Sequence, residues 1–132
     1  MSNNAYINDS CKIQRMEVTS LSTNPTVIFQ GKALLKNIYV VNTNSASVFV
    51  VKVYDKATLP DENDTPVLTW EFTTFTGGLF SSSNLRRNTD IFFENGISIR
   101  TTNSGSGFDD NSTSPAIVAS GTEWIYVMYK EV

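Results

Sequence analysis

The sequence predicts an all-β protein, a single antiparallel β-sandwich of about eight strands with a jelly-roll-like arrangement. Ser, Thr and Asn make up about a third of the 132 residues, whereas Lys and Glu, which commonly fill the surfaces of helical proteins, are sparse. Short apolar runs rich in Val, Ile, Phe and Tyr recur between turn residues. A protein of this length is expected to form one domain whose core needs no disulfide.

The first third of the sequence predicts an arm and two strands. Residues 1–10 are polar and predict a flexible N-terminal arm, so that the sandwich domain spans residues 11–132. Residues 11–19 alternate, with Ile13 and Arg15 on one face and Met16 and Val18 on the other, as expected for a strand. The apolar run 26–29 follows Pro25 and predicts either a second strand or the segment that leads into the next one.

Two nearly continuous apolar runs come next, at residues 34–42 and 48–55. A polar turn at 42–45 joins them, so they predict a pair of strands whose two faces are both covered. The acidic residues 61–64 lie between Pro60 and Pro66, which exclude a regular helix or a central strand, and predict a loop.

Further strands are expected in the second half of the sequence. Residues 67–73 alternate and place Leu68, Trp70 and Phe72 on one face, which predicts that Trp70 belongs to the core. Residues 81–84 are expected to be a connection and residues 103–114 a polar loop. Asn95-Gly96 predicts a tight turn of type I′, in which both central residues need a positive φ. The remaining apolar runs predict strands at 91–93, 97–102, 116–119 and 123–129.

The residue types argue against catalysis and against several classes of ligand. The sequence has no histidine, and its single cysteine, Cys11, has no partner base, so no nucleophilic triad can be assembled and no enzyme activity or cofactor is predicted. The segment 109–111, Asp-Asp-Asn, could hold calcium, but solvated loop carboxylates are the favoured interpretation. The net charge of −3 and a single adjacent basic pair, Arg86-Arg87, argue against nucleic acid.

No membrane segment or secretory signal is predicted either, because no apolar run approaches the ~18 residues of a spanning helix and the start of the sequence lacks a basic region followed by an apolar one.

The aromatic residues leave one further possibility open. A group of them could form a platform on which sugars stack, although aromatic residues in strands more often pack in the core or across strands. Its members would be Tyr39, Tyr54, Trp70, Trp124, Tyr126 and Tyr129.

Four short segments carry a family resemblance. An apolar strand ends at Asn42, residues 52–58 read KVYDKAT, residues 64–69 read DTPVLT, and residues 93–99 read FENGISI. With these segments and its apolar last strand, the protein resembles small β-sandwich structural proteins of tailed-bacteriophage virions. That family's pattern has an apolar strand ending in Asn, then "vKvYDKAt", "DTPVLT" and "f.nGi.i".

The resemblance implies a non-enzymatic virion protein that is made in the host cytoplasm, most often a decoration protein bound to the assembled head. Its partners would be the major capsid protein or other virion proteins, and self-association would be compatible with this role. Two alternatives stay open: a carbohydrate-binding or receptor-binding module, and a tail or neck component. Neither a metal nor a cofactor is implied.

The loop 75–80 has two possible roles: it folds back on the core, which is the favoured interpretation, or it is a contact with a partner. Apolar residues in a loop with a glycine hinge suit anchors in a neighbouring pocket, and nearby arginines would supply charges at the rim. The residues in this prediction are Phe75, Leu79, Phe80, Arg86 and Arg87.

Overall fold

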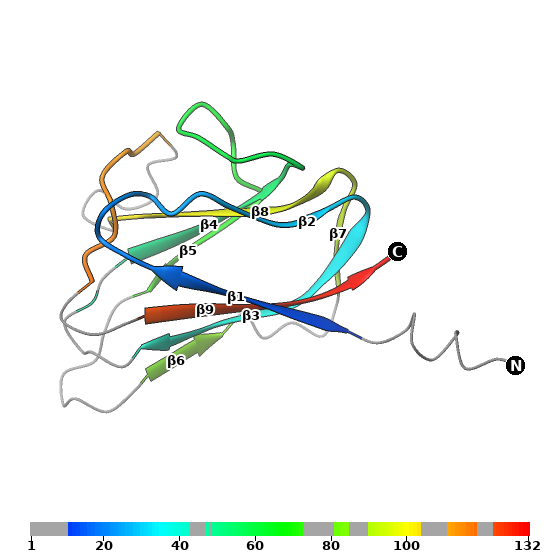
Figure 1. Ribbon diagram of the computed structural model, residues 1–132, viewed down its shortest axis with the longest axis horizontal. Helices are drawn as coiled ribbons and strands as arrows, with labels where there is room; N and C mark the ends of the chain where they lie inside the picture. Colours follow the sequence, from blue (N-terminus) through cyan, green and yellow to red (C-terminus); the bar gives the residue numbers. More distant parts are fainter. Residues whose placement is uncertain are drawn as a thin grey trace, which may run out of the picture.

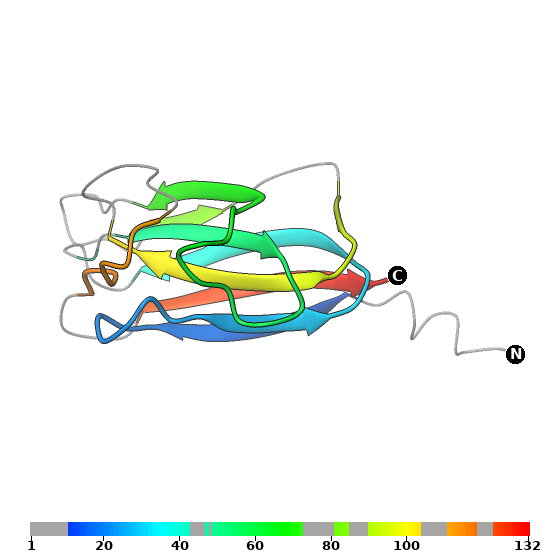
Figure 2. The same cartoon turned by 90° about the horizontal axis from the view of Figure 1, so that it is seen from above.

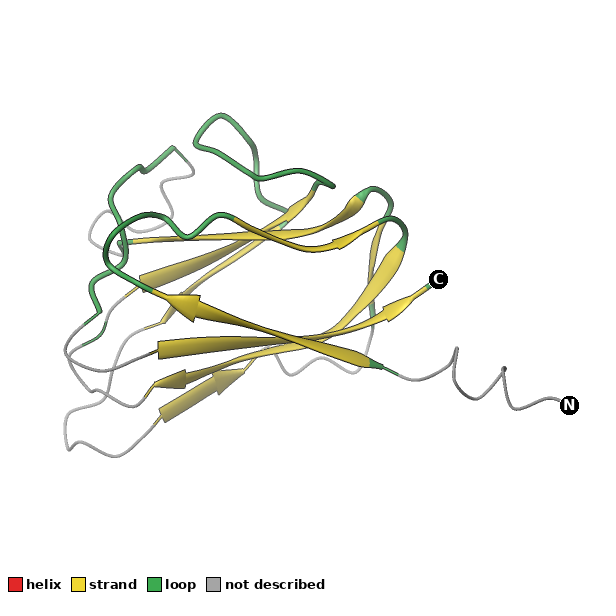
Figure 3. Ribbon diagram, viewed as in Figure 1, coloured by secondary structure: helices red, strands yellow, loops and turns green. Residues whose placement is uncertain are grey.

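The computed structural model describes residues 11–42, 47, 49–72, 81–84, 90–103, 111–118 and 123–132. Nine strands and no helix occur within these ranges, and Figure 3 shows strands joined by loops. The strands are β1 (Lys12–Val18), β2 (Thr26–Gln30), β3 (Ala33–Asn42), β4 (Phe49–Asp55), β5 (Leu68–Phe72), β6 (Ser81–Asn84), β7 (Ile91–Phe93), β8 (Gly96–Thr102) and β9 (Glu123–Glu131).

The strands form two antiparallel sheets that pack face to face (Figures 1 and 2). Sheet A has the order β1-β9-β3-β6, with β7 also paired to β3, and sheet B has the order β2-β8-β4-β5. The prediction of an antiparallel β-sandwich is therefore confirmed.

The pairing is that of a jelly roll. β1 pairs with β9, β2 with β8, β3 with β6 and β7, and β4 with β5, so the protein is a nested series of strand pairs rolled into two sheets. Since β9 occupies one edge of β3, β6 and β7 must share the other. β6 and β7 together occupy one strand position beside β3. The nine strands therefore fill eight positions, in agreement with the predicted number of about eight.

Three strand predictions need correction. The runs now seen as β3 and β4 do not pair with each other, because the chain passes from sheet A to sheet B between them and each strand pairs with a partner distant in the sequence, β9 for β3 and β8 for β4. Residues 81–84 are a strand, β6, because their backbone pairs with the edge of β3 although their side chains carry no strand signal. Of the strand predicted at 116–119, residues 116–118 form a loop with one isolated bridge at Ile117, Ala116 is buried in the core, and residue 119 lies outside the described residues.

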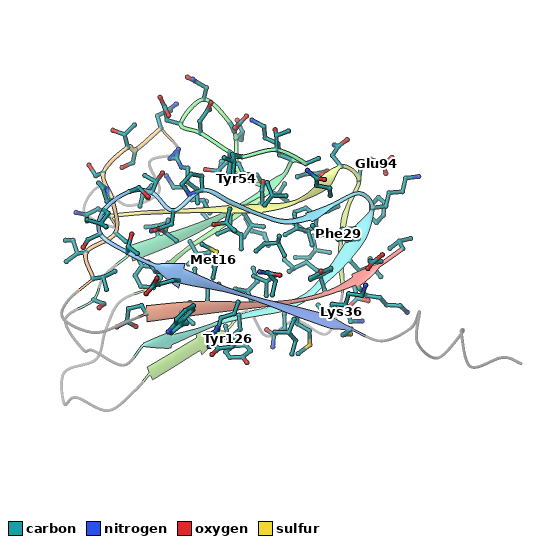
Figure 4. All side chains as sticks on the ribbon, in the orientation of Figure 1. Met16, Phe29, Lys36, Tyr54, Glu94 and Tyr126 are labelled. Atoms are coloured by element: carbon teal, nitrogen blue, oxygen red, sulfur yellow. The ribbon has the colours of Figure 1, made fainter. Side chains whose placement is uncertain are left out.

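The core lies between the inner faces of the two sheets. Phe29 of sheet B and Tyr129 of sheet A meet across it, with ring centroids 5.3 Å apart, and Figure 4 shows Phe29 and Met16 inside the sandwich. The buried apolar cluster comprises Met16, Val18, Ile28, Ala33, Leu35, Ile38, Val40, Phe49, Val51, Val53, Phe93, Ile97, Ile99, Ala116, Ile125, Val127 and Tyr129.

The outer faces of the two sheets differ. On sheet B every residue from Phe49 to Tyr54 is buried and so is all of β8, including Lys52 and its register partner Arg100. The loop 56–67 lies over this face, and the segment 111–118 runs from its edge down one end of the sandwich (Figures 1 and 2). The Arg100 guanidinium donates to the Ser112 carbonyl at 2.5 Å. Along residues 33–40 of β3, where burial is described, only the inner face is fully buried and the outer face is half-buried, so the expectation that both faces are covered holds for β4 and is wrong for this part of β3.

Candidate functional site

The outer face of sheet A gathers aromatic side chains from its two central strands, β3 and β9, beside an arginine of the edge strand β1. The register places Tyr126 of β9 between Tyr39 of β3 and Arg15 of β1, and it places Trp124 of β9 opposite Glu17 of β1. Paired residues of antiparallel strands project from the same face, and the alternate residues of β9 are core residues. We call the group Arg15, Tyr39, Trp124 and Tyr126 the aromatic face.

Two close contacts order the aromatic face. The rings of Tyr39 and Tyr126 stack with centroids 5.0 Å apart and an interplanar angle of 3°. The guanidinium carbon of Arg15 lies 4.1 Å from the centre of the Trp124 ring. A cation over an indole ring at an exposed site contributes about 0.5–1 kcal/mol. The three rings are half-buried whereas Arg15 is exposed, and Figure 4 shows Tyr126 pointing away from the interior.

Apolar side chains extend this surface along the same face of the sheet. Ile13 of β1 is opposite Met128 of β9, and Leu34 of β3 is opposite Phe92 of β7. Ile13 and Phe92 are 58% and 50% exposed. Aromatic, arginine and aliphatic groups therefore run from one edge of sheet A toward the other.

The arrangement suits contact with another protein surface better than stacking of sugars. Tyr39 and Tyr126 cover one face of each other's rings, and Arg15 lies over a face of Trp124, so these ring faces are already occupied. Tyr, Trp and Arg are the residue types that most often anchor protein interfaces. Of the six aromatic residues considered as a platform, three come together here, Tyr54 and Tyr129 are buried, and the side chain of Trp70 lies outside what the structure describes.

The other predicted site residues lie elsewhere. Phe75, Leu79, Phe80, Arg86 and Arg87 fall outside the described residues, so their role as a contact stays a prediction. The same is true of the first two residues of the segment 109–111, whereas the side-chain amide of its third residue, an asparagine, donates to the carbonyl of residue 62 at 2.6 Å. Within the described ranges no group of three or more metal-binding side chains occurs.

Three of the segments that carry the family resemblance, residues 52–58, 64–69 and 93–99, meet at one corner of sheet B. The Asp55 carboxylate accepts hydrogen bonds from three successive backbone amides: Glu94 N at 3.2 Å, Asn95 N at 2.8 Å and Gly96 N at 3.3 Å. The next residue, Lys56, donates to the Asp64 carboxylate at 2.7 Å. These motif residues therefore hold the fold together, and none of them lies on the aromatic face.

The turn at Asn95-Gly96 is tight, but it is not of type I′. Within the described residues only Asn24 and Gly31 have a positive φ, so the predicted reason for the glycine is wrong. A Cβ atom at position 96 would lie 2.6 Å from the Phe29 carbonyl oxygen and 2.9 Å from that of Lys56. Glycine is required there by lack of space. The turn also joins β7 of sheet A to β8 of sheet B rather than forming a hairpin.

The ion pair between Lys56 and Asp64 at the same corner shifts the pKa of Asp64. The hydrogen bond from Lys56, assisted by the backbone N–H of Asp61, lowers the pKa of the Asp64 carboxyl below its usual value of 3.8. The shift has a structural origin, since both donors fix the loop 56–67.

In comparisons with known proteins, no family model and no curated protein matches this sequence.

Of the aromatic face, Tyr39, Trp124 and Tyr126 are visible in the sequence as candidate platform residues, whereas Arg15 is not. Only the register between β1 and β9 brings Arg15 to Trp124. The structure has no helix long and apolar enough to cross a bilayer within its described part.

Proposed function

We propose that this protein is a non-enzymatic structural component of a tailed-bacteriophage virion, a decoration protein bound to the assembled head through the outer face of sheet A. The observation that carries the proposal is the asymmetry of the sandwich. Sheet B is closed by the protein's own loops, whereas sheet A presents Arg15, Trp124 and the Tyr39–Tyr126 stack. None of the described loops lies over this outer face, and a larger shell would cover it.

The family resemblance supports the virion setting, and the surface chemistry supports the docking face. In this role the tyrosine stack would form the rigid centre of the contact, because two stacked rings lose little conformational freedom when they are covered. Arg15 would bring a charge that is already held over Trp124 and that can meet a carboxylate of the partner. The partner would be the major capsid protein or another virion protein.

The test measures binding of purified protein to assembled shells by co-sedimentation. The variant changes two of the three exposed residues of β1 on this face, Ile13→Ser with Arg15→Ser, and leaves Glu17 and every core residue intact. The matched control is Leu21→Ser, which removes an apolar side chain that is 90% exposed in the loop after β1.

The double variant should bind at least about tenfold more weakly, as expected when interface anchors are truncated, and the control should bind like the wild type. The melting temperature of each isolated variant should stay close to that of the wild type. Full binding by the double variant would contradict docking through sheet A.

A second candidate function is a carbohydrate-binding or receptor-binding module. The observation in its favour is that Tyr39, Trp124 and Tyr126 gather on one outer face, as sugar-binding aromatics do. Binding on a glycan array that is lost on Trp124→Ala, together with no binding to shells, would select this alternative. A tail or neck location is the remaining variant of the virion role, and it is distinguished by the position of the protein in the particle.

A further inference from the structure

The β7–β8 turn contains the only Asn-Gly dipeptide of the sequence, Asn95-Gly96, and one carboxylate holds it. The amides of both residues donate to the same oxygen of Asp55, Oδ1, at 2.8 Å and 3.3 Å, and the amide of Glu94 donates to Oδ2 at 3.2 Å. Glu94 marks this turn in Figure 4. The Asn95 side chain is exposed and makes no hydrogen bond with the part of the protein that the structure describes.

An Asn-Gly sequence is prone to a specific covalent reaction. The backbone nitrogen of the glycine loses its proton to water or hydroxide and attacks Cγ of the asparagine side chain. The new C–N bond closes a succinimide ring, while the bond from Cγ to the amide nitrogen Nδ2 breaks and that nitrogen leaves as ammonia. A water molecule then opens the ring at either carbonyl, which gives aspartate or isoaspartate. Glycine favours the attack because it has no Cβ beside the nitrogen.

The fold opposes the first step of this reaction in two ways. The backbone N–H of Gly96, whose nitrogen must attack, donates a hydrogen bond to the Asp55 carboxylate. The negative charge of this carboxylate disfavours loss of the N–H proton, because the resulting anion would lie beside it. The peptide is also fixed on both sides, because Gly31 N donates to the Asn95 carbonyl at 2.9 Å and Lys56 N donates to the Gly96 carbonyl at 3.2 Å. The nitrogen therefore cannot swing toward the Asn95 side chain without breaking these contacts.

We infer that Asn95 is a latent deamidation site, modified by solvent water and protected in the native fold by Asp55. Local opening of the β7–β8 turn removes the protection. The modified turn would not regain its native structure, because isoaspartate adds a methylene to the backbone of the two-residue connection. The amides of residues 94–96 could then no longer all reach the Asp55 carboxylate. A second negative charge would arise next to Asp55 as well. Molecules that have opened would thus be marked and hindered from closing again.

The experiment incubates the intact protein at physiological temperature and mildly alkaline pH and follows the tryptic peptide 88–100 by mass spectrometry. The readouts are the mass increase of deamidation at Asn95 and the formation of isoaspartate. Wild type is compared in buffer and in denaturant, which requires no variant. Asp55→Asn removes the charge with little change of shape, and Asp64→Asn is the matched control, since it removes a carboxylate of the same corner that does not contact residues 94–96.

Native wild type should deamidate at Asn95 at least about tenfold more slowly than denatured wild type, as expected when a hydrogen bond to a charged group must first be broken. Asp55→Asn, kept below its melting temperature, should lose most of this protection, and Asp64→Asn should keep it. Equal rates in the native and denatured wild type would overturn the inference. So would a folded Asp55→Asn variant that reacts as slowly as the wild type.

Discussion

Replacing Gly96 with alanine tests whether space or backbone conformation requires this glycine. The added Cβ would lie 2.6 Å from the Phe29 oxygen, 2.9 Å from the Lys56 oxygen and 3.0 Å from Cα of Ala57. All three atoms belong to the backbone, and they come from two segments, the end of β2 and the start of the loop 56–67. No side-chain rotation can relieve the contacts.

The expected cost follows from these distances. Overpacking a close-packed site costs about 1–3 kcal/mol, and we expect the upper end here, about 3 kcal/mol, because backbone must move. The hydrogen bond from Gly96 to Asp55 also limits how far residue 96 can move. For a domain of this size the change corresponds to a decrease of roughly 10 °C in melting temperature.

The assay is urea unfolding followed by circular dichroism, with Gly96→Asn as the discriminating variant. If the glycine served a positive φ, asparagine would be tolerated better than alanine, because asparagine adopts such conformations more readily. Lack of space predicts that asparagine costs at least as much as alanine. A cost of less than about 1 kcal/mol for alanine, or clear rescue by asparagine, would refute the steric explanation.

Three further predictions concern the loops and the core. Asp64→Asn should lower the melting temperature at neutral pH. Since the folded pKa of Asp64 lies below 3.8, the stabilisation by Lys56 is complete above that value, and the difference from wild type should vanish as the pH falls through the folded pKa. Asn24, with a φ of 53° and a hydrogen bond to Thr101, should tolerate glycine better than alanine by about 1 kcal/mol in urea unfolding, and the reverse order would contradict this account. Trp70→Ala should cost about 3–5 kcal/mol and reduce solubility if the side chain is a core anchor, whereas unchanged stability would exclude that role.

The strands with the clearest apolar signal could be predicted closely from the sequence. The runs 34–42, 48–55, 97–102 and 123–129 correspond to β3, β4, β8 and β9 within one or two residues. Alternation in 11–19 also assigns Met16 and Val18 to the buried face of β1. These predictions succeed because burial of one or both faces demands apolar side chains at fixed spacing.

Strand partners could not be predicted in this way. An apolar pattern specifies which face of a strand is buried but not which strand lies alongside. The short polar turn between the runs 34–42 and 48–55 therefore suggests that they pair, although β3 and β4 lie in different sheets. β6 carries only Ser and Asn, so its pairing with β3 rests on backbone groups that leave no mark in the sequence.

The candidate site follows the same division. Tyr39, Trp124 and Tyr126 are recognisable as strand aromatics, but their meeting depends on the register of β9 with β3. The contact of Arg15 with Trp124 likewise depends on the register of β1 with β9. A sequence pattern contains neither register.

The most direct test of the central proposal is an electron-microscopy map of the intact particle at a resolution that orients the sandwich. The proposal predicts density for this protein on the outside of the head, with sheet A turned toward the major capsid protein and Trp124 and Tyr126 covered by it. Density at the tail or neck, or a head-bound protein whose sheet A faces solvent, would contradict the proposal.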